Sequence, residues 1–136
     1  MKQIDSIQEI LRIITEISDV SRAATCLSEN LSLLDPLIGD HSVNVARYAV
    51  LIGRQMGFPS DQNDTLLMAA LLHDIGKMGV PDSILLKPGE LNDEEQRIMH
   101  RHPEYAYEML SPIPYLRDAL DIPYCHHEWW NGSGYP

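Results

Sequence analysis

The chain has 136 residues, of which 44% are hydrophobic, and its 20 acidic and 10 basic side chains give it a formal net charge of −10. This acidity argues against a protein that coats DNA or RNA, because phosphate contacts need clustered Lys and Arg. The sequence has no apolar run of about 18 residues and no signal peptide, so we expect a cytoplasmic domain with no membrane insertion and with Cys26 and Cys125 as reduced thiols.

The first 35 residues are predicted to be helical. Apolar residues recur at spacings of three and four from Ile4 to Ile17, and a second apolar stretch runs over residues 23–34 before Pro36 breaks it. The segment has two interpretations, which the sequence leaves open. It is either a linker or packing helix of the domain, or a helix that joins an upstream sensor or a homodimer partner.

Two longer helices are predicted next, over about residues 36–56 and 60–72. The inward face of the first is predicted to contain Val43, Ala46, Val50 and Leu51. Ser60 can cap the second helix, whose last turns are almost wholly apolar. This second helix therefore places His73 and Asp74 at its carboxyl end, in surroundings with little water.

A fifth helix is predicted after a segment that is rich in glycine and proline. Asn92 and Glu95 have the spacing of a capping box, and we expect this helix to end near His102. Pro103 suits the start of a short helix that runs through Leu110.

Further helix is predicted from Tyr115 towards Trp130, with a disturbance at Pro123. No window alternates with a period of two, so the fold class predicted is all-α.

Two adjacent pairs of side chains point to metal chemistry, namely His73 with Asp74 and His126 with His127. A buried carboxylate is costly unless a cation pairs with it, and imidazole together with carboxylate suits Zn, Mn or Fe. Neighbours on a helix point about 100° apart, so an adjacent pair at a helix end can face two ions. Two metal ions are a known device for splitting phosphate esters.

Other residues near these pairs have both a chemical and an ordinary interpretation. His100 and His102 are two residues apart, so a helix can aim only one of them at a site, and His100 fits an ordinary surface histidine. Lys77 could neutralise a phosphate oxygen or lie at the surface. Glu128 could orient a histidine or form a surface salt bridge. Trp129 and Trp130 could stack on a purine base or pack in the core and at its rim.

The order of these motifs resembles the HD-GYP family, a subclass of the HD phosphohydrolases whose members are bacterial cyclic di-GMP phosphodiesterases. The resemblance covers residues 36–136 and implies the helical bundle of an HD domain. The motifs that carry it are His41, His73-Asp74-Ile75-Gly76-Lys77, Val80-Pro81-Asp82, Lys87-Pro88-Gly89, His102-Pro103, His126-His127-Glu128 and Asn131-Gly132-Ser133-Gly134-Tyr135-Pro136.

The resemblance implies a role for individual residues. The implied metal ligands are His41, His73, Asp74, His102, His126 and His127, with Asp74 as the bridging carboxylate. Lys77 is implied to approach the scissile phosphate. The signature loop, with Gly132, Gly134, Tyr135 and Pro136, is implied to contact substrate or partners such as GGDEF-domain proteins. Iron or manganese is the metal typical of the family.

Three departures from the family pattern shape these expectations. Leu37 stands where some members have a glutamate that helps to hold a third metal, so we expect two ions. Asn131 replaces a usual aspartate. The chain stops after the signature loop, whereas members of the family continue through helices that carry another metal-ligating aspartate and basic substrate-binding residues. We therefore expect the N-terminal part of such a domain.

The function predicted is hydrolysis of cyclic di-GMP to pGpG, and in some cases onward to GMP. A first alternative is a truncated or degenerate module that acts by protein–protein contact without catalysis. A second alternative is a generic HD-type phosphohydrolase that acts on mononucleotides.

Overall fold

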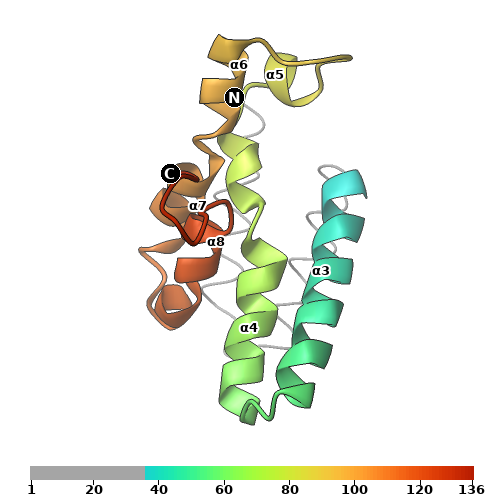
Figure 1. Ribbon diagram of the computed structural model, residues 1–136, viewed down its shortest axis with the longest axis vertical. Helices are drawn as coiled ribbons and strands as arrows, with labels where there is room; N and C mark the ends of the chain where they lie inside the picture. Colours follow the sequence, from blue (N-terminus) through green and yellow to red (C-terminus); the bar gives the residue numbers. More distant parts are fainter. Residues whose placement is uncertain (1–35) are drawn as a thin grey trace. The chain divides into compact units, whose positions relative to one another are not determined.

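The computed structural model describes residues 36–136, which form helices joined by turns and loops (Figure 1). No strand occurs in this range, which confirms the all-α class predicted. None of the described helices is long and apolar enough to cross a membrane. Three predictions lie outside the described residues. They are the helices within residues 4–34, the reduced thiol of Cys26 and the homodimer contact through the first helix.

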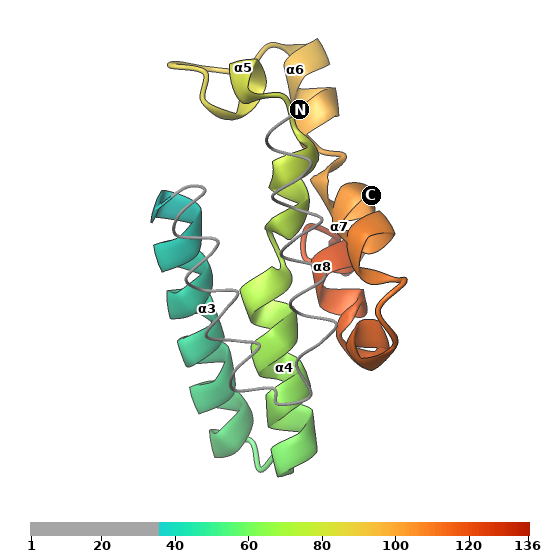
Figure 2. The ribbon, with the colours of Figure 1, turned by 180° about the vertical axis from the view of Figure 1, so that it is seen from behind.

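The described chain divides after Leu72 into two compact units. The first unit contains α3 (Pro36–Gln55) and α4 (Ser60–Leu72), which lie side by side and run in opposite directions (Figures 1 and 2). Their contact is built from small and medium-sized apolar residues, namely Val43, Val45, Ala46, Ala49, Leu67, Ala70 and Leu71. Both helices were predicted close to their observed bounds.

The prediction that Leu51 faces inward is wrong, because its side chain is 59% exposed. Ala46 is buried in the α3–α4 contact and fixes which side of the helix is inward. At 3.6 residues per turn, Leu51 lies about 140° around the helix from Ala46. Val50, which is half-buried, lies on the inward side as predicted.

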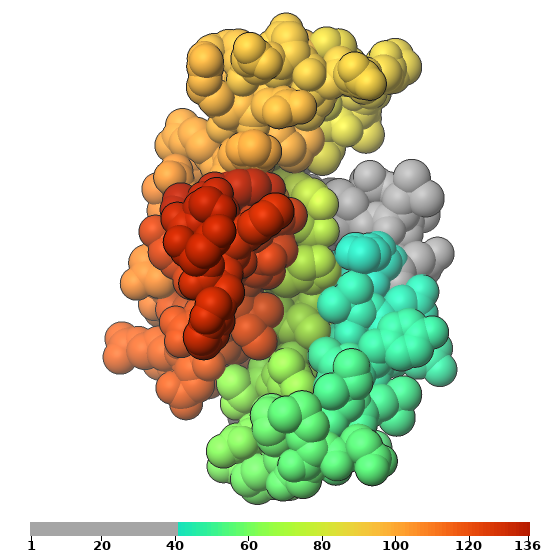
Figure 3. Space-filling model, viewed as in Figure 1, coloured from blue at the N-terminus to red at the C-terminus, as the bar shows by residue number. Residues whose placement is uncertain are grey.

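The second unit contains six short helices and ends in a loop over residues 126–136. The helices are η1 (Ile75–Gly79), α5 (Asp82–Leu85), α6 (Asp93–Met99), α7 (His102–Leu110), η2 (Pro114–Ala119) and α8 (Asp121–Cys125). The short helices η1 and α5 fall in the glycine- and proline-rich segment, where the sequence predicted no helix. In the space-filling view, the C-terminal residues lie uncovered at the surface of this unit (Figure 3).

The break between α6 and α7 positions His102. The predicted capping box of α6 is confirmed, since Asn92 Oδ1 accepts from Glu95 N (2.9 Å) and Glu95 Oε2 accepts from Asn92 N (2.8 Å). The helix ends at Met99, however, and His102 is the first residue of α7 rather than the end of α6. Pro103 explains the difference, because a proline ring in a continuous helix would clash with the carbonyl four residues earlier, at Met99.

The helical structure predicted from Tyr115 towards Trp130 is confirmed as far as Cys125, and the prediction beyond that residue is wrong. The segment forms η2 and α8, and helical structure ends at Cys125. Pro123 is the third residue of α8, in the first turn, where a missing N–H is tolerated. The C-terminal loop follows from His126 onward.

The absence of a side chain at Gly76 brings η1 close to α7. A Cβ at residue 76 would overlap the carbonyl oxygen of His102 and would lie 2.6 Å from the backbone nitrogen of Ala106. Both obstacles are backbone atoms, which cannot turn away as a side chain can. Gly76 therefore allows the start of α7, with His102, to lie against the segment that begins at Asp74.

We expect Gly76→Ala to lower the free energy of unfolding by about 3 kcal/mol, because the methyl group must push η1 and α7 apart. Urea unfolding followed by circular dichroism measures this loss. Gly79→Ala in the same helix is the matched control, since its Cβ would meet the side chain of Tyr105 at 2.8 Å rather than backbone. Equal losses in the two variants would contradict the close backbone contact at Gly76.

Candidate functional site

Asp74 lies at the centre of a group of polar side chains in the second unit. It follows α4 after a single residue, and its side chain is buried. Its Oδ2 lies 2.7 Å from Lys77 Nζ and 3.3 Å from His73 Nε2. Its Oδ1 lies 3.5 Å from His102 Nε2 and 3.6 Å from His126 Nε2. The two carboxylate oxygens therefore face different sets of partners.

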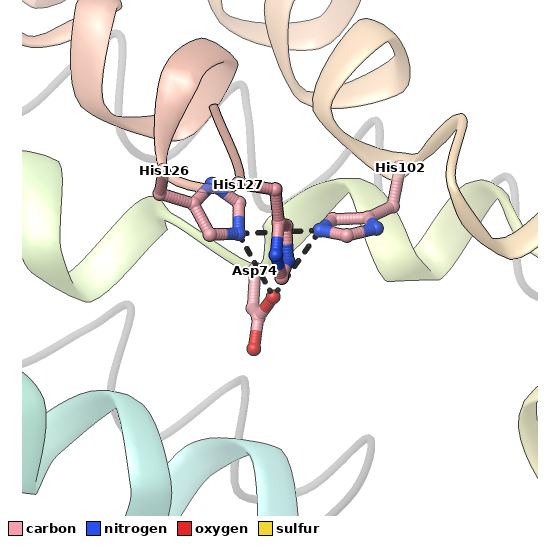
Figure 4. A group of neighbouring side chains, drawn as sticks. All are labelled: Asp74, His102, His126 and His127. Atoms are coloured by element: carbon pink, nitrogen blue, oxygen red, sulfur yellow. Dashed lines mark hydrogen bonds and ion pairs between the residues drawn. The ribbon is translucent and has the colours of Figure 1, made fainter. Parts of the chain in front are cut away.

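Four side chains could hold one metal ion. Asp74, His102, His126 and His127 each offer a ligand atom, and these atoms all lie within 4.8 Å of one another. Figure 4 shows the three imidazoles, from the start of α7 and from the turn that follows α8, pointing toward the Asp74 carboxylate. We call these four residues the Asp–His cluster. The sequence predicted each of them as a ligand, and the structure brings them together.

Backbone carbonyls fix the tautomers of two imidazoles in the cluster. His102 Nδ1 lies 2.9 Å from the carbonyl oxygen of Met99, and His126 Nδ1 lies 3.0 Å from that of Pro123. A carbonyl oxygen can only accept a hydrogen bond, so both Nδ1 atoms carry a hydrogen. In a neutral imidazole the other nitrogen, Nε2, then presents its lone pair.

These lone pairs face one another, and no cationic side chain among the described residues lies between them. His102 Nε2 and His126 Nε2 are 3.2 Å apart, and both face Asp74 Oδ1. That oxygen is buried and accepts no hydrogen bond from residues 36–136. A proton on one imidazole could join only two of these atoms at a time, whereas a metal ion accepts a lone pair from each. The donor set therefore fits a divalent metal ion.

The protonation states in the cluster suit metal binding. Burial opposes ionisation of Asp74, but the groups around its carboxylate, with the Lys77 ammonium group 2.7 Å from Oδ2 among them, outweigh burial and hold the pKa of its carboxyl well below the usual range. Burial lowers the pKa of His102 to about 4, and it also lowers the pKa of His127. At neutral pH, Asp74 is therefore a carboxylate, and His102 and His127 are neutral imidazoles, the forms that metal binding requires.

The other predicted site residues have different positions. His73 and Lys77 contact the Oδ2 side of Asp74, and the His73 ring lies edge-on to that of His126, with centroids 5.1 Å apart. Lys77 is partly exposed, so its ammonium group can reach a ligand in solvent. His41 lies on α3 in the first unit, and its side chain is exposed.

The signature loop is organised by Glu128. Glu128 Oε1 accepts hydrogen bonds from the backbone nitrogens of Trp129 and Gly134, both at 2.8 Å. Among residues 36–136 the carboxylate closes the loop, and it makes neither the histidine contact nor the surface salt bridge that the sequence suggested. Gly132 has a φ of +74° within this loop, and Pro136 is exposed.

Trp129 and Trp130 are not core residues, because both side chains are exposed. The core interpretation of this pair is therefore wrong, and a purine-stacking role stays a prediction. Both tryptophans belong to the loop that Glu128 closes, which projects them to the surface.

The sequence reasoning missed the contact between Tyr135 and two histidines. The Tyr135 ring is stacked on His127, with centroids 4.6 Å apart, and on His100, with centroids 4.0 Å apart. Of the two histidines at 100 and 102, only His102 belongs to the Asp–His cluster, as the sequence predicted, and His100 contacts Tyr135 instead. No signal in the spacing connects residue 100 with residue 135, because the loop conformation brings them together.

Comparison with known proteins identifies relatives of the chain. The family model described as an HD domain matches residues 25–136. A cyclic di-GMP phosphodiesterase response regulator of Xanthomonas campestris is 42% identical over 94 residues, which are 68% of this chain and 25% of the relative. A 3'3'-cGAMP-specific phosphodiesterase 2 of Vibrio cholerae is 42% identical over 100 residues, 72% of this chain and 19% of the relative.

A third relative, a cyclic di-GMP phosphodiesterase of Thermotoga maritima, is 43% identical over 98 residues, 71% of this chain and 27% of the relative. The chain thus spans between 19% and 27% of the length of these three relatives. The matches confirm the resemblance predicted from the order of the motifs.

We expect a divalent metal to stabilise the chain through Asp74. With Mn²⁺ at 100 times its dissociation constant, binding to the folded state alone adds about 2.7 kcal/mol. Asp74→Asn should lose most of this gain, because an amide is a poorer ligand than a carboxylate. The measurement is the thermal unfolding midpoint in Mn²⁺ and in EDTA.

Asp118→Asn is the matched control, because Asp118 is exposed on η2 and lies outside the Asp–His cluster. It should keep the full metal-dependent shift in midpoint. A shift that survives unchanged in Asp74→Asn would show that the metal binds elsewhere.

Proposed function

The chain belongs to the HD domain family, and we propose that it is a metal-dependent phosphodiesterase that hydrolyses cyclic di-GMP to pGpG, and onward to GMP. The observation that carries the proposal is the convergence of lone pairs from His102, His126 and Asp74, beside the Lys77 ammonium group. The names of the relatives supply the class of substrate, since all three are named as phosphodiesterases of a cyclic dinucleotide.

We propose that the site holds two divalent ions, iron or manganese. The proposed ligands are His41, His73, Asp74, His102, His126 and His127. Asp74 suits a bridging role, because its Oδ1 faces His102 and His126 while its Oδ2 faces His73. When bound, such ions supply Lewis acidity to phosphoryl oxygens and lower the pKa of water that attacks phosphorus.

Lys77 is proposed to bind a phosphate oxygen of the substrate. Its Nζ lies 2.7 Å from Asp74 Oδ2, so the ammonium group is held at the edge of the Asp–His cluster. A cation fixed in this place can stabilise the negative charge that grows on the phosphoryl group, or protonate the leaving alkoxide. The chain's strong negative charge makes such a local cation important for a dinucleotide with two phosphates.

A second candidate substrate is 3'3'-cGAMP. A phosphodiesterase specific for this dinucleotide and one for cyclic di-GMP are both 42% identical to the chain. The two substrates share the phosphodiester that is cleaved and differ in one purine. The metal centre therefore serves both, and the residues that contact the base decide between them.

We propose a cytoplasmic location, where a cyclic dinucleotide signal is made and degraded. The loop with Gly132, Gly134, Tyr135 and Pro136 is proposed as a contact for substrate or for GGDEF-domain partners. The exposed Trp129 and Trp130 in the same loop suit stacking on a guanine base or on a partner surface.

The direct test is turnover by the chain loaded with Mn²⁺ or Fe²⁺. Cyclic di-GMP, 3'3'-cGAMP and GMP-type mononucleotides are incubated in separate reactions, and products are separated by chromatography. We expect linear dinucleotide from cyclic di-GMP. A chain that binds metal but turns over none of these substrates faster than Asp74→Ala would contradict the proposal and favour the module that acts by protein contact.

We expect Lys77→Met to lower kcat for cyclic di-GMP by about 100-fold, because the variant removes the positive charge that lies beside the reacting phosphate. The metal content should stay unchanged. Steady-state kinetics with metal analysis measures both quantities. Lys87→Met is the matched control, since Lys87 pairs with Glu95 at a similar exposure. A similar loss in both variants would argue against a specific role for Lys77.

A further inference from the structure

Tyr135 is the middle ring of a column of three rings. Its plane is within 13° of the His100 ring and within 14° of the His127 ring, with centroid distances of 4.0 and 4.6 Å. The column joins two distant parts of the chain, the end of α6 and the C-terminal loop. His100, at one end of the column, is exposed to solvent, and His127, at the other end, belongs to the Asp–His cluster.

The C-terminal loop is built so that Tyr135 returns to His127. The backbone nitrogen of Tyr135 donates to the carbonyl oxygen of His127 (3.3 Å), and Glu128 holds the backbone of Gly134. A Cβ on Gly134 would overlap the carbonyl oxygen of His127 and lie 2.7 Å from Glu128 Cα. Only glycine therefore permits this close return of the loop.

His127 differs from the other imidazoles of the cluster in what orients it. His102 and His126 are each held by a hydrogen bond from Nδ1 to a backbone carbonyl. Within residues 36–136 the His127 side chain makes no such hydrogen bond. Its ring contacts are with His102, His126 and Tyr135, and only the contact with Tyr135 is a parallel stack. Tyr135, which also stacks on His100, is therefore the contact best placed to orient the plane of the His127 ring.

We infer that His100 and Tyr135 are positioning residues, which fix the plane of the His127 ring so that its nitrogen faces the metal ion in the Asp–His cluster. The inference rests on the metal site under the proposed function, and it adds a role for a histidine outside the predicted ligands. Partners that orient a metal-binding histidine typically change metal affinity by about 10- to 100-fold when they are removed. Here the orienting contact is a stack of rings in place of a hydrogen bond.

The first arm of the test examines the column in metal-free protein. Ring protons of an imidazole that stacks on tyrosine are shifted upfield by the ring current, and nuclear magnetic resonance of the histidine side chains measures this shift. We expect Tyr135→Leu to remove the upfield shift at both His100 and His127. Unchanged His127 resonances in this variant would overturn the inference without reference to any metal.

The second arm measures Co²⁺ affinity by titration of the visible absorption bands of the bound ion. We expect His100→Ala to bind Co²⁺ about tenfold more weakly, in line with the loss of an orienting partner. His100→Phe keeps a flat ring and should restore the affinity. Gln96→Ala, at an exposed position one helical turn earlier, is the control and should bind as the unsubstituted chain does.

The outcomes separate this inference from the proposed function. Equal Co²⁺ affinity in the unsubstituted chain and in His100→Ala would overturn the inference alone. Equal weakening in His100→Ala and His100→Phe would also overturn it, because ring stacking could not then be the cause. An unsubstituted chain that binds no Co²⁺, although its ring-current shifts are present, would overturn the metal site and the proposed function together.

Discussion

The lone pairs that converge on Asp74 Oδ1 are the constraint on which the site depends. Two imidazole nitrogens lie 3.2 Å apart beside a buried carboxylate oxygen, and their outer nitrogens are committed to backbone carbonyls. A cation at the centre of this arrangement would accept a lone pair from each of the three atoms and stabilise all of them together. A fold that holds these atoms in place is therefore organised for a ligand with positive charge rather than for the stability of the protein alone.

The local backbone of the second unit enforces this convergence. Pro103 separates α6 from α7, so that α7 begins at His102. The His102 imidazole therefore lies in the first turn of α7, where its Nδ1 donates to the carbonyl oxygen of Met99. Gly76 allows that turn to lie against the segment that carries Asp74. On the other side, α8 ends just before His126, and the carbonyl of Pro123 holds its ring in the same way. The same device is thus used twice.

Sequence rules predicted the parts of this arrangement that depend on neighbouring residues. These local signals are the capping box of Asn92 and Glu95, the effect of Pro103, and the adjacent His–Asp and His–His pairs. The order of the motifs predicted the set of metal ligands. What the sequence missed depends on contacts between distant segments. The stack of Tyr135 on His100 and the closing of the loop by Glu128 have no periodic signal, because an irregular loop sets them.

The central claim is that the Asp–His cluster binds a metal through imidazole nitrogens and a carboxylate. X-ray absorption at the metal edge of the chain loaded with one equivalent of Mn²⁺ tests it most directly, because imidazole rings give a distinctive outer-shell scattering pattern. The account predicts nitrogen and oxygen ligands with the signal of at least three imidazoles, from His102, His126 and His127. A spectrum with oxygen ligands alone, as for a hydrated ion at the acidic surface, would contradict it.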